Sequence, residues 1–128
     1  MSEEHPNLAL LQRLDPRNLT SSAGLFTEDV VWHFFNPKLP DIQGDYVGLA
    51  GIGSFFEKLG ARTSGTFKVE PISVRAVGDE LVVMHTRNTM VLEDEDVATD
   101  VVVVWRIVDG RIAEIWDIPS VYTTANPG

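Results

Sequence analysis

The sequence has 128 residues, with 44% hydrophobic and 23% charged side chains, a formal net charge of −9 and no cysteine. This length fits a single domain spanning residues 1–128, with its core at about residues 8–122. The negative charge argues against binding of nucleic acid, which depends on clustered Lys and Arg. The lack of cysteine excludes disulfides, thiolate zinc sites and cysteine nucleophiles.

Two segments bear on the location of the protein. The N-terminal residues Met-Ser-Glu-Glu-His-Pro are acidic and lack the apolar segment of a secretory signal. The longest strongly apolar run, residues 101–105, is far shorter than the roughly 20 residues that span a bilayer. We therefore expect a cytoplasmic protein that does not contact a membrane.

The first half of the chain predicts helices and one strand. Leu-rich residues 7–13 predict a short helix, and residues 18–25 predict a second one. The β-branched and aromatic run at residues 30–35 predicts a strand, and the prolines and glycine of residues 36–45 indicate a loop. A longer helix is predicted over residues 49–59, where apolar side chains recur at helical spacing before Gly60, the expected C-terminal cap.

The second half predicts strands only. The four segments are residues 66–77, 81–92, 98–108 and 111–118. Gly78-Asp79 and Asp109-Gly110 are turn signals that join neighbouring strands as hairpins. Helices followed by consecutive antiparallel strands predict an α+β fold, and strands of this length must twist. We therefore predict N-terminal helices packed in the concave face of a strongly curved antiparallel sheet.

Metal binding is not expected. The acidic residues 93–96 indicate a solvated hairpin tip, because a calcium loop would contain glycine among its ligands. His5, His33 and His85 lie far apart in the sequence, without the spacing of a zinc site.

Three motifs carry a resemblance to a known family. Phe26-Thr-Glu-Asp-Val-Val-Trp-His33 looks like its entry into the first strand, and Gly44-Asp-Tyr-Val-Gly48 looks like its turn before the long helix. Asp109-Gly-Arg-Ile-Ala-Glu-Ile-Trp-Asp117 looks like its last strand. Across about residues 8–122 the chain resembles the SnoaL-like polyketide cyclase and ketosteroid isomerase-like families of the nuclear transport factor 2-like (cystatin-like) superfamily. The resemblance implies an α+β cone around a ligand cup, but no single reaction, because isomerases, cyclases, dehydratases, epoxide hydrolases and non-catalytic members share this fold.

The resemblance also assigns catalytic positions. Ketosteroid isomerases place an oxyanion-binding Tyr, a second oxyanion donor and a base at positions that fall at about Leu14, Val103 and Phe34 of this chain. All three are apolar here, so steroid isomerisation by that set of residues is not implied. In the cyclases the acid/base Asp lies on the last strand, where Asp117 matches it. The resemblance therefore implies a catalytic role for Asp117.

Strand alternation supports this assignment independently. If Asp117 faces the cup, Ile115 faces it too, and the inner wall carries one carboxylate among apolar side chains. Desolvation there disfavours the charged carboxylate and raises its pKa toward a useful acid–base range. A structural role stays open, in which Asp117 pairs with Arg87 or caps the loop after the strand.

The second strand of the meander supplies two further candidate catalytic residues. Alignment with the isomerase-like pattern puts His85, Arg87 and Thr89 on its inner face. His85 would orient or relay a proton, and Arg87 would hold a carbonyl or enolate oxygen. With the opposite parity, His85 and Arg87 would face solvent or a dimer partner.

Other side chains are expected to line the pocket and contact the substrate. Direct counting turns Trp32 and Phe34 inward and His33 outward, although a bulge would turn His33 into a polar contact. The remaining expected pocket residues are aromatic or aliphatic side chains suited to a hydrophobic ligand, namely Tyr46, Phe56, Val103, Trp105 and Ile115.

The third strand of the meander predicts self-association. It is apolar on both faces, with Val102 and Val104 on the side opposite to Val103. Such a strand needs cover on both faces, and the helices reach only the concave one. We therefore expect a homodimer through the convex face of the sheet.

Together these features predict a pocket for a small hydrophobic organic molecule. The favoured activity is that of a cofactor-independent cyclase, isomerase or lyase, in which Asp117 is the general acid/base on a carbonyl-bearing substrate. The alternative is a non-catalytic ligand-binding or dimerisation module with the same cup.

Overall fold

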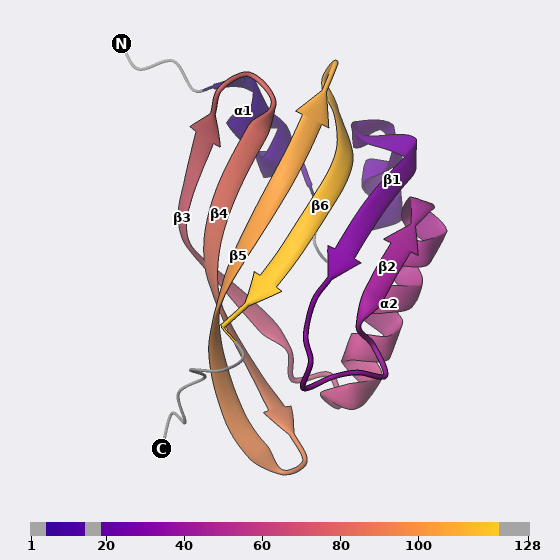
Figure 1. The fold of residues 1–128 in the computed structure, drawn as a ribbon, viewed down its shortest axis with the longest axis vertical. Helices are drawn as coiled ribbons and strands as arrows, with labels where there is room; N and C mark the ends of the chain where they lie inside the picture. The colour runs from indigo at the N-terminus through magenta and orange to yellow at the C-terminus, as the bar shows by residue number, and fades with distance from the viewer. Residues whose placement is uncertain (1–4, 15–18, 121–128) are drawn as a thin grey trace.

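The computed structural model describes residues 5–14 and 19–120, and Figure 1 shows its fold. The helices are α1 (Pro6–Gln12), the 3-10 helix η1 (Leu19–Leu25) and α2 (Gly48–Arg62). The strands are β1 (Phe26–Phe34), β2 (Gly44–Val47), β3 (Lys68–Val77), β4 (Leu81–Leu92), β5 (Glu95–Val108) and β6 (Arg111–Pro119). Among the described residues, no helix is long and apolar enough to cross a membrane.

Helix α1 begins at a proline and buries one face. Pro6 suits the first helical turn because an amide hydrogen would find no partner there. His5 Nδ1 accepts a hydrogen bond from the Asn7 amide at 3.1 Å and so caps the helix. Leu10 and Leu11 are buried, and the helix lies against β3 and β4. It therefore covers one end of the concave face of the sheet.

Helix α2 covers the other side of that face, against β1 and β2. Its buried residues are Ile52, Phe55 and Leu59, at the predicted helical spacing. The helix continues to Arg62, so the prediction that Gly60 caps it is wrong. The chain turns only after Thr63, where Gly65 takes up a left-handed conformation with φ of +75° that favours glycine.

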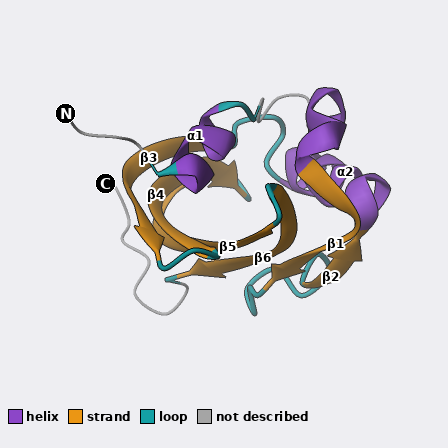
Figure 2. Cartoon of the chain, turned by 90° about the horizontal axis from the view of Figure 1, so that it is seen from above, coloured by secondary structure: helices purple, strands orange, loops and turns teal. Residues whose placement is uncertain are grey.

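The six strands form one sheet in the order β2-β1-β6-β5-β4-β3. Neighbouring strands are antiparallel, except that β1 runs parallel to β6. Seen from above, the sheet is strongly curved, and α1 and α2 lie on its concave side (Figure 2). The predicted α+β fold, with helices in the concave face of a strongly curved sheet, is thereby confirmed, although the sheet is mixed and not purely antiparallel.

Strand boundaries differ from the prediction by the most at three places. Strand β1 begins at Phe26, earlier than expected, and β2 lies partly within the predicted loop 36–45. Strand β5 begins at Glu95, because Glu93 and Asp94 make a tight turn with φ of 52° and 66°. Two consecutive positive φ angles are typical of a two-residue hairpin turn. Glu93 and Asp94 therefore form the hairpin tip, Glu95 and Asp96 belong to β5, and all four are exposed.

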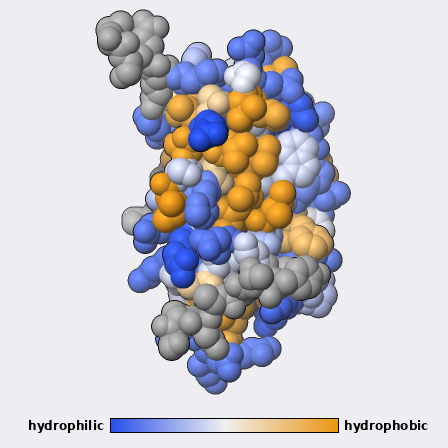
Figure 3. All heavy atoms as spheres, turned by 60° about the vertical axis from the view of Figure 1, so that its left-hand side comes forward, coloured by the Kyte–Doolittle hydropathy of each residue, from blue (hydrophilic) through white to orange (hydrophobic). Residues whose placement is uncertain are grey.

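The convex face of the sheet carries exposed apolar side chains. Val102 and Ile118 lie opposite each other on β5 and β6 and are both exposed. Val83, Val104 and Trp116 form a neighbouring row across β4, β5 and β6. Figure 3 shows hydrophobic residues gathered on this side of the molecule, with hydrophilic residues around them. The two-sided apolar character predicted for β5 is therefore present in the structure.

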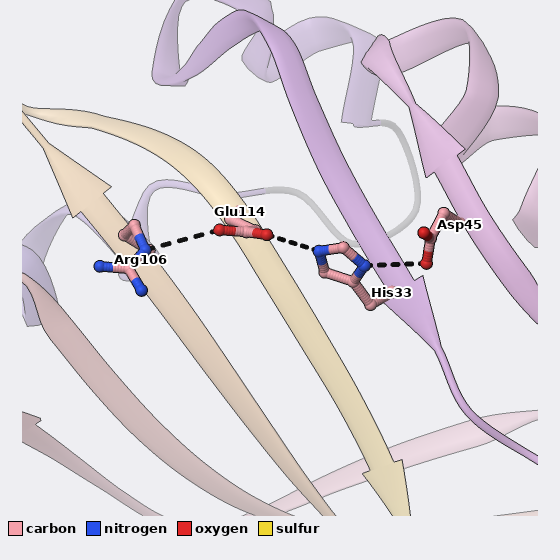
Figure 4. Close-up of polar contacts among 4 residues, drawn as sticks. All are labelled: His33, Asp45, Arg106 and Glu114. Carbon is pink, nitrogen blue, oxygen red and sulfur yellow. Dashed lines mark hydrogen bonds and ion pairs between the residues drawn. The ribbon is translucent and has the colours of Figure 1, made fainter.

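A network of charged residues crosses the same face and joins four strands (Figure 4). His33 on β1 places Nδ1 2.8 Å from Asp45 Oδ1 and Nε2 2.6 Å from Glu114 Oε2. Arg106 on β5 continues the network with Nε 3.5 Å from Glu114 Oε1, and it also pairs with Glu80. The His33 ring stacks on Trp116 at 5.4 Å. His33 thus links the β2–β1 edge to the meander strands.

The two carboxylates around His33 control its charge. Partial burial opposes protonation, but the hydrogen bonds with Glu114 and Asp45 outweigh it and raise the pKa of His33 above its usual value. A folded-state pKa above the unfolded value means that the network stabilises the fold below about pH 6.5 and loses this contribution as the pH rises through the folded pKa.

We expect His33→Gln to lower the free energy of unfolding by about 1 kcal/mol near pH 6, because partly exposed ion pairs contribute about that much. Near pH 8.5, where the charge of His33 contributes less, the loss should be smaller. Urea unfolding of both proteins at the two pH values measures the difference. An equal loss at both would show that the charge of His33 does not matter.

Candidate functional site

The concave face of the sheet and the helices enclose a cavity of about 1120 Å³. Its wall is mainly aromatic and aliphatic, with side chains from α1, β1, α2, β4, β5 and β6 that include Leu11, Phe34, Phe55, Met84 and Val101. Ligand pockets for organic molecules usually have volumes of about 300–1000 Å³. The cavity therefore has room for a molecule with several rings.

Asp117 is the one acidic side chain that β6 presents to this cavity. Its neighbours across the sheet are Val103 on β5 and Phe34 on β1. Its side chain is buried, with 9% of the residue exposed, and no described residue makes a hydrogen bond or ion pair with its carboxyl group. Desolvation by burial raises the pKa of Asp117 to about 7. Near neutral pH the carboxyl group is thus present in both its acid and its base form.

The predicted partners of Asp117 lie on the opposite side of the sheet. His85 Nε2 lies 3.0 Å and Arg87 Nη1 3.5 Å from Asp100 Oδ1, and both side chains are about 40% exposed on the convex face. Thr89 has the same parity and is exposed. The predicted inward orientation of these three residues is wrong, and so is the alternative in which Arg87 pairs with Asp117.

The register of β4 on β5 explains this error. Met84 lies opposite Val103 and Thr86 opposite Val101, so the even-numbered residues of β4 share the inner face. Thr86 and Asn88 are therefore the polar side chains that β4 gives to the cavity, with 2% and 6% of each residue exposed. The sequence prediction missed both. Asp100 could have indicated the correct orientation of β4. It alternates to the outer face of β5, where its carboxylate can pair with His85 and Arg87.

Most of the predicted apolar wall residues do face the cavity. Those that line it are Trp32, Phe34, Phe56, Val103 and Trp105. Ile115 is fully buried in the core beside them. Contact of any of these side chains with a substrate stays a prediction.

Tyr46 and His33 lie outside the cavity lining, as Thr89 and Ile115 do. Tyr46 packs on Phe55 and donates its hydroxyl hydrogen bond to the Ile42 carbonyl oxygen, so it supports α2 from β2. His33 faces outward, as direct counting predicts, and the bulge that would turn it inward is not present at that residue. Its assignment as a substrate contact is wrong because its ring lies in the convex-face network.

Two indole groups add unpaired donors to the apolar wall. Trp32 and Trp105 meet edge to face, with ring centroids 6.4 Å apart. Their Nε1 atoms are buried and have no hydrogen-bond partner in the described part of the chain. Both rings lie on the cavity wall near Asp117. Trp32 is two residues from Phe34 and Trp105 is two residues from Val103, and Phe34 and Val103 are the cross-strand neighbours of Asp117.

The positions that the isomerase resemblance assigns to catalysis also line the cavity. Leu14, Phe34 and Val103 all contribute apolar surface to it. Asp117 is the buried acidic group of the wall. Of the other charged residues that line the cavity, Arg62 is half-buried and pairs with Asp41, and the rest are exposed, namely Lys38, Lys68, Glu93 and Glu95. Within residues 5–14 and 19–120, no group of three or more His, Asp or Glu side chains could hold a metal ion.

Comparison with solved structures shows the same fold. Bal32a, from a soil-derived mobile gene cassette, is 24% identical, with a TM-score of 0.79 over 91% of this chain and 92% of that chain. A nuclear transport factor 2-like protein of unknown function from Burkholderia pseudomallei is 18% identical, with a TM-score of 0.78 over 95% and 94%. A protein from Jannaschia sp., assigned as a SnoaL-like polyketide cyclase, is 14% identical, with a TM-score of 0.75 over 95% and 92%.

Comparison of the sequence itself gives the family. No curated protein matches the chain. Residues 8–115, which include most of α1, the 3-10 helix, α2 and all of the sheet up to the middle of β6, match the SnoaL-like domain. The chain therefore belongs to the SnoaL-like domain family.

Proposed function

We propose that this protein is a cofactor-independent cyclase, isomerase or lyase that uses Asp117 as general acid/base on a hydrophobic, carbonyl-bearing substrate. The observation that carries the proposal is a buried carboxyl group without a partner on the wall of a large apolar cavity. A carboxylate that served only structure would be paired, because an unpaired buried charge is costly. Unpaired carboxyl groups with raised pKa values are typical of catalytic sites.

The proposed chemistry begins with proton abstraction. The Asp117 carboxylate takes a proton from the carbon next to a substrate carbonyl, and the electrons of the broken C–H bond form an enolate. The Asp117 acid then returns the proton. In isomerisation it goes to another carbon of the enolate. In cyclisation the enolate carbon bonds to a second carbonyl of the same substrate, and the resulting alkoxide receives the proton. Neither route consumes a co-reactant.

Structures of the same fold support this substrate class. One of them, TerC, was co-crystallized with polyporic acid, and it is 22% identical with a TM-score of 0.70. The Jannaschia protein assigned as a polyketide cyclase shares the fold as well. Both descriptions are compatible with a ring-containing organic ligand in an apolar cavity.

The competing proposal is a non-catalytic ligand-binding module. It is favoured by the apolar residues at the three isomerase positions and by the outward orientation of His85 and Arg87. In that case Asp117 would only donate or accept a hydrogen bond to the ligand. Replacement of Asp117 separates the two proposals, because it would weaken binding in one and abolish proton transfer in the other.

We expect the protein to catalyse exchange of the acidic C–H hydrogens of β-tetralone for deuterium, measured by proton NMR in deuterated buffer. Asp117→Asn should lower this rate by about 10²–10⁴-fold, which is the usual contribution of general acid–base catalysis. The rate should rise with pH through about 7, as the base form of Asp117 accumulates.

The matched control is Asp100→Asn, which removes a carboxylate from the convex face and should leave exchange unchanged. Equal exchange by the unaltered protein and Asp117→Asn would show that Asp117 is not the base. Binding of β-tetralone with no exchange above buffer would favour the non-catalytic module.

Asp117→Asn should raise the stability of the fold at high pH, although it lowers the exchange rate. The unfolded chain ionises Asp117 near pH 4, whereas the folded protein keeps the proton up to about pH 7. Stability therefore falls as the pH rises between these values, by up to about 4 kcal/mol. Asp117→Asn carries no ionisable group, so it should be more stable than the unaltered protein near pH 8.5 and about equal near pH 4. Urea unfolding at both pH values tests this, and a pH-independent difference would contradict it.

We also propose that the convex face mediates a homodimer. Val102 and Ile118 are exposed at the centre of this face, next to the row of Val83, Val104 and Trp116. A sheet face with this much apolar surface is typical of an interface. Charged residues such as His85, Asp100 and Arg106 surround it and could pair across a two-fold axis.

Size-exclusion chromatography with light scattering should give the mass of a dimer at micromolar concentration. The double variant Val102→Lys, Ile118→Lys should give a monomer, because it places four charges in the dimer interface. Val47→Lys is the control, since Val47 is exposed on β2 at the far edge of the sheet. A monomer for the unaltered chain would rule out this dimer.

A further inference from the structure

We infer that Asn88 is a second ligand-binding group of the cavity, which holds an uncharged oxygen atom of the molecule on which Asp117 acts. The inference rests on the proposed function of Asp117 and extends it to the shape and chemistry of the ligand. Asn88 lies on β4, in the wall of the same cavity, and 94% of the residue is buried, since 6% is exposed. Each polar atom of a side chain buried to this degree normally has at least one hydrogen-bond partner.

Asn88 has only part of its hydrogen-bonding capacity satisfied. The Thr86 hydroxyl donates a hydrogen bond to Asn88 Oδ1 at 2.9 Å. No residue in the described part of the chain accepts a hydrogen bond from Asn88 Nδ2. Because Thr86 occupies the oxygen side of the amide, the two N–H groups are available to the cavity. Thr86, itself fully buried, thus acts as a positioning residue that fixes which end of the amide a ligand meets.

The surroundings of Asn88 select an uncharged partner. Its neighbours on the inner face are Val69 on β3 and Thr99 on β5 across the sheet, with Thr86 and Met90 along β4. None of these carries a charge. A carboxylate or phosphate among these neighbours would lose its hydration without gaining a cation from them, which is costly. Lys68, the next residue to Val69 in the cavity lining, is exposed and keeps its own hydration. A carbonyl, hydroxyl or ether oxygen needs only the hydrogen bond that Asn88 Nδ2 offers.

The distance from Asp117 sets the length of the ligand. Asp117 lies opposite Val103, Val103 lies opposite Met84, and Asn88 is four residues further along β4. Two strand spacings and four residues correspond to about 17 Å between Cα atoms in a flat sheet. The sheet curves toward the cavity (Figure 2), so the side chains converge.

Each hydrogen bond takes up about 2.8 Å of this span, and the side chains converge from the two strands, so a ligand with two oxygen atoms about 10 Å apart would reach both groups. The wall between the two groups is apolar and includes Met84 and Val101. The ligand class is therefore an elongated, uncharged molecule with at least two rings and an oxygen at each end.

Biphenyl derivatives have this geometry and can test the inference by calorimetric titration near pH 8, where Asp117 is largely ionised. The probes are para-phenylphenol, its para′-hydroxy derivative, its para′-methyl derivative and its para′-carboxylate. We expect the first hydroxyl group to bind Asp117, since hydrogen bonds to charged groups are the stronger ones. The second hydroxyl should tighten binding about 3–10-fold relative to the methyl derivative, as one neutral hydrogen bond does. The carboxylate should bind more weakly than the diol.

Asn88→Leu should abolish the preference for the diol over the methyl derivative, whatever it does to the affinity for the apolar part of the probes. Thr86→Val should reduce the preference, because the amide is no longer held in one orientation. Met90→Leu is the control, since it alters the same stretch of β4 without changing a hydrogen bond, and it should keep the preference.

The comparison of probes on the unaltered protein decides the matter even if a variant fails to fold. A diol that binds no tighter than the methyl derivative would overturn the role of Asn88 and leave the proposed function of Asp117 standing. A carboxylate that binds more tightly than the diol would overturn the preference for an uncharged oxygen. No binding of any biphenyl would overturn both the inference and the hydrophobic substrate class.

Discussion

The burial of one unpaired carboxyl group is the constraint on which the rest of this structure depends. Asp117 lies between two neighbouring strands that present Val103 and Phe34 to it, so it receives neither a counter-charge nor a hydrogen bond from the described residues. Desolvation alone then raises its pKa to about 7. A group in this state destabilises the fold above neutral pH, and it is held in place because β6 is hydrogen-bonded on both sides, to β1 and β5.

The fold separates two kinds of polar residue across the sheet. Charged side chains such as His33, Arg106 and Glu114 lie on the convex face, where they pair with one another and remain partly hydrated. The inner face keeps uncharged polar groups, Thr86 and Asn88, whose burial costs far less than that of an ion. Asp117 breaks this rule, and a single exception of this kind indicates a functional group more strongly than its position on the last strand does.

The sequence allowed the fold and the wall of the cavity to be predicted, but not the polar residues of β4. On β5, the odd-numbered residues Val101, Val103 and Trp105 share one apolar face. Asp117 lies opposite Val103, so it faces the same side. On β4, the two faces are nearly equal in apolar content, because Met84 and Val82 on one side balance Val83 and Leu81 on the other. Alternation alone cannot choose between such faces. Only a cross-strand partner can, and Asp100 decides the choice for His85 and Arg87.

No cation among the described residues pairs with Asp117, and this restricts the chemistry that Asp117 can perform. With His85 and Arg87 on the outside, desolvation is the cause of the pKa of Asp117, and no described cation contributes to it. An enolate formed beside Asp117 is then stabilised by neutral donors, such as the indole N–H groups of Trp32 and Trp105, or by its own conjugation. Neutral hydrogen bonds offset less charge than an ion pair does. The proposed reaction therefore requires a substrate whose C–H bond is already acidic, as between two carbonyl groups, and a ligand with oxygens at both ends of a conjugated ring system meets this requirement and also reaches Asn88.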